Sequence, residues 1–176
     1  YNFSTFNDIS LIDCSILNDF KLSISLNNVF VSGGEIYPNA ADLYINEGSS
    51  IQSNTSMAFA YHTNVYIAGG EVYCNMNARL VSQLYISGGT IRGAINIPGG
   101  GTAGVLTAPA KLHISGGTFY SPITIAGGYC EITNGTFNDK ITITQGGVDA
   151  INTCNITGGT FSSPINVNDG TCNITG

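Results

Sequence analysis

The chain is poor in charge, and the charge it has is mostly negative. Its 176 residues include five Lys and Arg against eleven Asp and Glu, which gives a formal net charge of −6. Proteins that bind nucleic acids neutralise phosphates with a basic surface, so this composition argues against a nucleic-acid partner. Ser, Thr, Asn or Gly interrupts every apolar stretch within a few positions, and no run reaches the length that crosses a bilayer. We therefore expect no nucleic-acid partner and no membrane span.

Cysteine is scarce and odd in number, with five residues, and tryptophan is absent. No two cysteines have the Cys-x-x-Cys spacing and there are only two His, so the sequence predicts no zinc site. The chain begins at Tyr1 without an initiator Met or a signal peptide. We expect it to be either a processed mature chain or a piece of a longer one.

The dominant positive feature is an internal repeat. One unit, in which an apolar residue or Cys is followed two positions later by Ile or Val and then by a Gly-containing corner, recurs seven times. The copies begin at Val29, Val65, Leu84, Leu112, Cys130, Cys154 and Cys172. Between them apolar and polar residues alternate and Gly-Gly, Asn-Gly and Asp-Gly pairs recur, a pattern typical of short strands and turns. No segment shows a convincing helical period.

Each unit is too short to bury its own apolar row, so the units must stack on one another. A basic coil of about 18 residues predicts an all-β protein, a parallel β-helix or β-solenoid, with roughly eight coils about 4.8 Å apart. Parallel crossovers strongly prefer one hand, which predicts a right-handed winding. We expect a single domain over 1–176, with degenerate first coils over 1–28, regular coils over 29–171 and the start of an incomplete coil over 172–176.

Stacking places equivalent residues in columns. Phe119, Phe137 and Phe161 should form an inward ladder. Cys130, Cys154 and Cys172 should share another inward column, where plain packing is favoured and one disulfide between neighbours is the alternative.

Both ends of this solenoid are expected to be open, because no segment resembles an amphipathic cap. Either the rest of a longer chain or a second copy stacked head to tail should cover them. The residues that would make these contacts are Tyr1, Phe3, Phe6, Cys172, Ile174 and Gly176.

Long and short coils alternate in the spacing of the repeats. The extra residues fall at 49–64, 101–111 and 147–153, and we expect them to project as loops from one corner of alternate coils. Loops on a rigid scaffold often carry binding, so this edge is either a shared binding or lateral-packing surface or a set of tolerated insertions. Its candidate residues are Met57, Phe59, Tyr61, Leu106 and Ile151.

Two outward aromatic columns are also expected. The first contains Phe30, Tyr66, Tyr85 and His113, and the second contains Tyr37, Tyr73 and Tyr120. An exposed aromatic stripe suggests stacking on sugars or burial against a partner, and the alternative is that the long loops fold over it.

Catalytic groups are sparse. Enzymes on this fold commonly act on polysaccharides through outward carboxylates on neighbouring coils. His113 and Glu131 should be outward neighbours, for which a surface ion pair is favoured over an acid/base pair. Glu35 and Glu71 are expected in one corner column, a weak cation candidate. We name no catalytic residue, no metal ligand and no cofactor.

The ISGGTF and ITGGTF units at 114–119 and 156–161 resemble the repeats of bacterial secreted right-handed β-helix proteins. These include surface adhesins, autotransporter passengers and polymorphic outer-membrane proteins. The likeness covers 29–176 and is specific for the fold but weak for function. It implies an extracellular, cell-surface location.

The sequence thus favours a non-catalytic structural or adhesive extracellular β-solenoid, either a segment of a longer surface stalk or a subunit that stacks head to tail into a filament. Its partners would be copies of itself or the rest of a longer chain. The alternative is a carbohydrate-binding or polysaccharide-cleaving β-helix, including the phage tail fibre or spike type, with glycans as partners.

Overall fold

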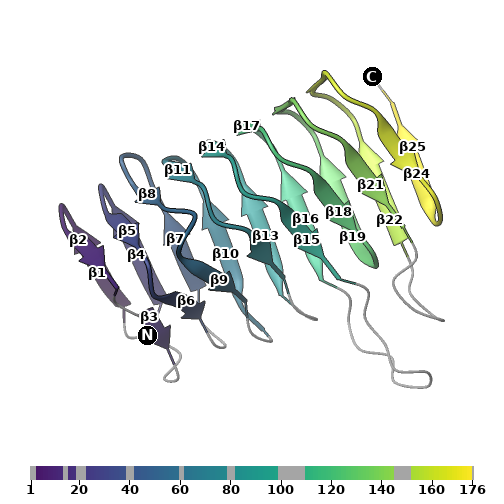
Figure 1. The fold of residues 1–176 in the computed structure, drawn as a ribbon. Coiled ribbons are helices and arrows are strands. Elements are labelled where there is room, and N and C mark those ends of the chain that lie inside the picture. The colour runs from purple at the N-terminus through teal and green to yellow at the C-terminus, as the bar shows by residue number, and fades with distance from the viewer. Residues whose placement is uncertain are drawn as a thin grey trace.

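The computed structural model describes residues 3–13, 16–18, 23–38, 42–59, 62–78, 82–98, 110–144 and 152–175. Within these ranges all regular structure is β-strand. The strands form three parallel sheets in which each strand pairs with the strands three places before and after it in the chain. This arrangement is a β-solenoid, which confirms the predicted fold class (Figure 1). No helix in the described ranges is long and apolar enough to cross a membrane.

We name the sheets A, B and C in the order in which each coil passes through them. Sheet A contains β1 (Phe3–Asn7), β4 (Ser23–Asn27), β7 (Asp42–Ile45), β10 (Asn64–Ile67), β13 (Gln83–Ile86), β16 (Lys111–Ile114), β19 (Gly128–Ile132), β22 (Asn152–Ile156) and β25 (Thr171–Ile174). Sheet B contains β2 (Ser10–Ile12), β5 (Phe30–Ser32), β8 (Ser50–Ile51), β11 (Glu71–Val72), β14 (Thr90–Ile91), β17 (Thr118–Phe119), β20 (Thr136–Phe137) and β23 (Thr160–Phe161). Sheet C contains β3 (Ile16–Asn18), β6 (Glu35–Pro38), β9 (Ser56–Ala58), β12 (Met76–Asn77), β15 (Ile95–Ile97), β18 (Ile123–Ile125), β21 (Ile141–Ile143) and β24 (Ile165–Val167).

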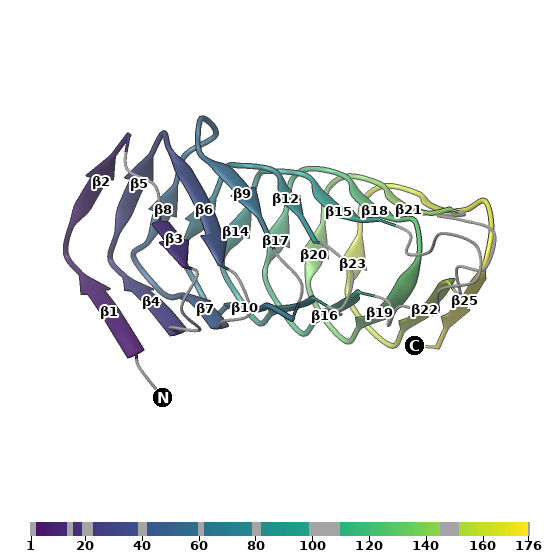
Figure 2. The same ribbon diagram turned by 90° about the horizontal axis from the view of Figure 1, so that it is seen from below.

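The coils follow one another along a single axis, and β1 and β25 lie at opposite ends of it (Figure 2). A coil has about 20 residues. The shortest coils have the predicted length, since His113 and its neighbour Glu131 in the next coil are 18 residues apart. The other two expected loops, over 101–111 and 147–153, lie mostly outside the described residues. The residues outside the description are 99–109, which include Leu106, and 145–151, which include Ile151. Tyr61 also lies outside it.

The prediction of a loop over 49–64 was wrong. This segment contains β8 and β9 and belongs to a complete coil that begins at β7. The coil is hard to recognise because its corner reads Asn46-Glu47-Gly48, with a single glycine of φ 74° in place of a Gly-Gly pair. Met57 and Phe59 are therefore core residues, 1% and 0% exposed, and are excluded from a binding edge.

The same coil shifts the register of the first repeat. Leu43, not Val29, is the equivalent of Val65, because β7 pairs with β10. Val29 lies instead at the corner between β4 and β5. The predicted equivalence of Phe30 with Tyr66 was consequently wrong: Phe30 belongs to sheet B, where it pairs with Ser10 and Ser50.

Two further column assignments were wrong for the same reason. Tyr37 lies in sheet C, where it pairs with Leu17, and does not share a column with Tyr73 and Tyr120. Glu35 pairs with Ser56 in sheet C, whereas Glu71 pairs with Ser50 in sheet B, so the proposed two-glutamate cation site does not form.

The core consists of inward columns that run along the axis. The predicted phenylalanine ladder is confirmed: the ring centroids of Phe119 and Phe137 are 4.7 Å apart, those of Phe137 and Phe161 are 4.8 Å apart, and the planes are nearly parallel. A longer column in sheet A leads from Phe6 and Leu26 through Ile residues to Ile156 and Ile174. Packing of like residues at the strand spacing of about 4.8 Å thus builds one continuous core of buried residues along the axis.

The first coils make the corner between sheets A and B without a glycine pair, as the degenerate sequence of 1–28 indicated. Asp8 and Asn28 adopt φ of 51° and 53°, in the left-handed region. Asx residues tolerate this region better than other residues with a side chain. The Nδ2 of Asn28 also donates a hydrogen bond of 2.6 Å to Oδ1 of Asp8, which fastens the two corners together.

Candidate functional site

An aromatic ladder runs along the outer face of sheet A. Tyr44, Tyr66, Tyr85 and His113 occupy one in-register column on four successive coils. Their ring centroids are 4.7, 5.0 and 4.8 Å apart and their planes lie within 8° of parallel. All of these except Tyr44 were predicted from the sequence, and the Leu-Tyr-Ile context of Tyr44, which matches that of Tyr85, was sufficient to find it.

The ladder buries the faces of its own rings. Adjacent rings at van der Waals spacing leave edges and hydroxyls, not faces, for contact with a ligand. Two of the hydroxyls are engaged as well, since Tyr85 donates a 2.6 Å hydrogen bond to Oε1 of Gln83 and Tyr44 a 3.3 Å one to Oδ2 of Asp42. Burial, together with the carboxylate of Asp42, raises the pKa of Tyr44 and Tyr66 above 10.0. The ladder is thus a poor platform for stacking a sugar.

The expected contact between His113 and Glu131 is present. Nδ1 of His113 lies 3.1 Å from Oε2 of Glu131, and the side chains are 27% and 42% exposed. The next residue in this column is Asn155, so no second carboxylate stands beside Glu131. Among the described residues, no group of three or more His, Cys, Asp and Glu side chains is arranged to hold a metal ion. The geometry is that of a surface ion pair when the histidine is protonated.

A second aromatic cluster lies at the corner between sheets B and C. Arg92 is placed between Tyr73 and Tyr120, with its guanidinium carbon 5.7 Å and 4.5 Å from the two ring centroids. The hydroxyl of Tyr73 donates a 2.8 Å hydrogen bond to Glu71, which raises the pKa of this tyrosine. Both tyrosines were predicted from the sequence, but Arg92 was not, because a column of unlike residues gives no repeat signal.

Phe30 has a different environment from the ladder. Its in-register neighbours are the small residues Ser10 and Ser50, and the side chain is 39% exposed. It lies in an open depression of about 320 Å³. The other residues that line this depression are Asp8, Ile9, Ser10, Asn28, Gly48 and Ser50. This is an aromatic ring with a carboxylate, an amide and hydroxyls around it.

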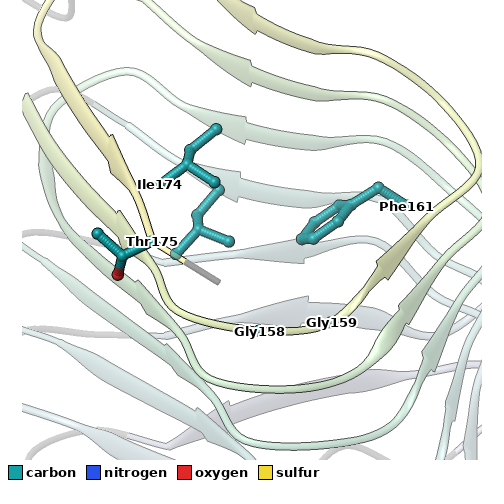
Figure 3. Close-up of a pocket in the computed structure, with 6 residues that line it drawn as sticks. Gly158, Gly159, Phe161, Ile174 and Thr175 are labelled. Carbon is teal, nitrogen blue, oxygen red and sulfur yellow. The ribbon is translucent and has the colours of Figure 1, made fainter.

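The last described coil exposes the ends of the core columns. A hollow of about 180 Å³ is lined by Ile156, Gly158, Gly159, Phe161, Ile174 and Thr175. Figure 3 shows Ile174 and Phe161 on opposite sides of this hollow, with the two glycines along one edge. Ile174 is 61% exposed and Val167 is 46% exposed, although both continue columns that are buried in earlier coils.

The other predicted end residues are placed as follows. Phe6 and Cys172 are half-buried against the core, and Phe3 belongs to β1. Tyr1 and Gly176 lie outside the described residues.

Three cysteines form the predicted inward column of sheet A. Cys130 pairs with Cys154, and Cys154 pairs with Cys172, in register on β19, β22 and β25. All three are free thiols. Cys74 is a separate buried thiol whose pKa is raised by burial to about 12.

Comparisons with family models, with curated proteins and with solved structures gave no match to this chain. The resemblance of the ISGGTF and ITGGTF units to bacterial surface repeats stays a prediction.

Proposed function

We propose that this protein is a rigid, non-catalytic structural or adhesive solenoid that is extended coil by coil at the face formed by β23, β24 and β25. The observation that carries the proposal is the exposure of Ile174 and Val167 at positions that are fully buried in the preceding coils. Strand edges with unpaired backbone groups and exposed apolar residues favour pairing with another strand.

The energetic case rests on the residues at this face. Full burial of an Ile or Val side chain contributes about 1.5–3 kcal/mol, so covering these partly exposed side chains contributes on the order of 1 kcal/mol each. The backbone groups of β25 would gain hydrogen-bond partners at the same time. A coil stacked on the end face therefore stabilises the protein by burying these side chains and pairing this strand, and it continues the columns of the core.

The face has a step, because sheet A extends one strand beyond sheets B and C among the described strands. The coil that fits it passes through B and C before A. A further coil of a longer stalk has this order. A second copy begins at β1 in sheet A and leaves a seam above β23 and β24. In both cases the solenoid is extended by stacking. A further coil gives a longer chain, whereas a second copy gives a filament.

The test is to append one more coil, a repeat of residues 159–176, to the 176-residue chain. We expect the midpoint of thermal unfolding to rise by about 5 °C, because the exposed residues become buried. The matched control carries the same appended residues in scrambled order. Electron microscopy and sedimentation of the unextended chain test whether copies stack on one another. Filaments with an axial repeat of roughly 43 Å, which is the nine strands of sheet A at the strand spacing, would indicate stacking of copies.

Ile174→Asp is the variant that distinguishes stacking from other association. It should abolish filaments and the gain from the appended coil, whereas Thr157→Asp, on the outer face after β22, should leave both intact. If the appended coil adds no stability and the unextended chain stays monomeric at every concentration, the proposal is overturned.

An extracellular, cell-surface location fits a stalk or adhesin. Its support is the resemblance of the repeat units to bacterial surface proteins, and immunogold labelling of intact cells of the source organism would test it.

A second candidate function, carbohydrate binding, is favoured by the surroundings of Phe30. Sugar rings stack on exposed aromatic faces while carboxylates and amides accept and donate hydrogen bonds to their hydroxyls. Phe30 has serines on both sides, so its ring faces are not covered by other rings, and Asp8 and Asn28 stand at the same depression. The rings of the ladder on sheet A, in contrast, stack on one another and leave their edges for contact.

An array of neutral oligosaccharides tests the second candidate. Binding should be lost in Phe30→Ala and retained in Tyr120→Ala, an exposed aromatic at another corner. An array without a bound oligosaccharide, or equal binding by the two variants, would contradict it.

A further inference from the structure

The cysteine column of sheet A brings three thiols to one line in the interior. In-register neighbours in a parallel sheet have Cα atoms about 4.8 Å apart. This lies inside the range of about 4.4–6.8 Å over which a disulfide can form. Each of the pairs Cys130–Cys154 and Cys154–Cys172 is in register and so meets this Cα requirement. A disulfide also requires Cβ atoms about 3.5–4.5 Å apart, so the two strands must approach each other slightly for the bond to close.

The two pairs differ in access to solvent. Cys130 and Cys154 are 0% exposed, whereas Cys172 is half-buried on β25, the last described strand of sheet A. A reagent in solution reaches Cys172 first. Cys172 also has a neighbouring strand on one side only among the described residues, so its backbone has more freedom to adjust to the geometry of a disulfide.

The thiols are in-register neighbours and influence one another's ionisation. Hydrogen bonds from Cys130 and Cys172 lower the pKa of the Cys154 thiol, with the Cys130 contact as the larger cause. The same contact with Cys154 raises the pKa of Cys130, and burial raises the pKa of Cys172. Thiolates are the nucleophiles of disulfide exchange, so exchange at this column should proceed faster at mildly alkaline pH.

We propose that Cys154 and Cys172 are an inducible disulfide pair, in which Cys172 is the entry site for a small-molecule disulfide and Cys154 is the resolving thiol. The link would join β22 to β25 and fasten the last described coil to the one before it. The inference does not rest on the proposed function, but it holds for chains whose end face is uncovered, because a coil stacked on β25 would bury Cys172 as Cys130 and Cys154 are buried.

The chemistry has two exchange steps. The thiolate of Cys172 attacks one sulfur of the small-molecule disulfide, which gives a mixed disulfide on Cys172 and releases one small thiolate. The thiolate of Cys154 then attacks the Cys172 sulfur of the mixed disulfide, which forms the Cys154–Cys172 bond and releases the second small thiolate. The two cysteines are oxidised, the small disulfide is reduced to two thiols, and the two protons of the cysteines pass to solvent or to those products.

The test uses the 176-residue chain with Cys14 replaced by serine, because Cys14 lies outside the described residues. The chain is incubated with oxidised glutathione at mildly alkaline pH, free thiols are alkylated, and the link is mapped by tandem mass spectrometry of proteolytic fragments. We expect a fragment pair that joins Cys154 to Cys172, with Cys130 and Cys74 alkylated only after denaturation. The oxidised protein should unfold at a temperature about 5 °C higher than the reduced one.

Two variants separate this pair from its neighbours. Cys172→Ser should give no internal disulfide, and Cys130→Ala should still give the Cys154–Cys172 link. A Cys130–Cys154 link, a glutathione adduct that persists on Cys172, or full recovery of free thiols would each overturn the proposal. The experiment measures which residues are linked. A variant that is merely less stable would therefore not give the expected Cys154–Cys172 fragment pair.

Discussion

The guanidinium carbon of Arg92 lies 4.5 Å from the centroid of the Tyr120 ring, one coil further along the solenoid. Tyr73 flanks the same guanidinium from the preceding coil at 5.7 Å. A cation held between two aromatic rings ties three coils together at a corner where the strands themselves are only two residues long.

Arg92→Gln should therefore destabilise the protein. A cation–π contact at an exposed site is worth about 0.5–1 kcal/mol, and two such contacts are lost. We expect a decrease of about 1 kcal/mol in the free energy of unfolding, measured by urea denaturation. Lys111→Gln, which removes a charge from an exposed position of β16, is the control and should change the value by less than about 0.5 kcal/mol. Equal effects of the two substitutions would show that the rings do not hold the cation.

Phe137→Ala should cost more stability than Phe161→Ala. Phe137 is 1% exposed and has a ring on each side, so its removal leaves a cavity, for which about 3–5 kcal/mol is typical. Phe161 has a ring on one side and is only half-buried, so its truncation exposes the site to solvent instead. Urea denaturation of the two variants gives the comparison, and the reverse order would contradict the described packing.

Gly93→Ala should be among the most damaging small substitutions. A Cβ at this position would stand 1.8 Å from the carbonyl oxygen of Cys74 in the preceding coil, so the backbone of one coil must move. Overpacking of this kind typically costs about 1–3 kcal/mol. Thermal unfolding measures the loss, and Ser87→Ala, on the outer face after β13, is the control that should be nearly neutral.

Alkaline pH should weaken the fold through the tyrosine ladder. The pKa of Tyr66 and Tyr44 is raised in the folded state, so above pH 10 the unfolded chain releases phenol protons more readily than the native one. The unfolded state then binds fewer protons, and the free energy of unfolding falls as pH rises above 10. Denaturation at a series of pH values should show a smaller fall in the double variant Tyr44→Phe, Tyr66→Phe. A fall of the same size in that variant would assign the effect to other groups.

The spacing of the repeat is sufficient to predict most of the fold. Positions such as Leu84, Tyr85 and Ile86 recur with a fixed spacing, and stacking of identical strands leaves one arrangement that buries them. The phenylalanine ladder, the cysteine column and the contact of His113 with Glu131 follow directly from that spacing.

The errors of register have one physical source, which is that different residues can form the corner between two sheets. Gly48 alone turns the coil that a Gly-Gly pair turns elsewhere, and Asn28 does so without glycine. A repeat defined by Gly-Gly corners therefore omits the coil of Leu43, misplaces Phe30 and assigns buried Met57 to a loop. Arg92 was missed because contacts between unlike residues in neighbouring coils leave no periodic trace in the sequence.

The strict register of the three sheets makes the length of the molecule proportional to the number of its coils. Every described strand pairs only with its equivalents in the coils before and after it, so the cross-section is independent of how many coils there are. Duplication or deletion of one coil would change the length by about 4.8 Å and leave the contacts between coils away from that point as they were. The length of such a solenoid can thus change during evolution in equal steps of one coil, while the residues that form its core stay the same.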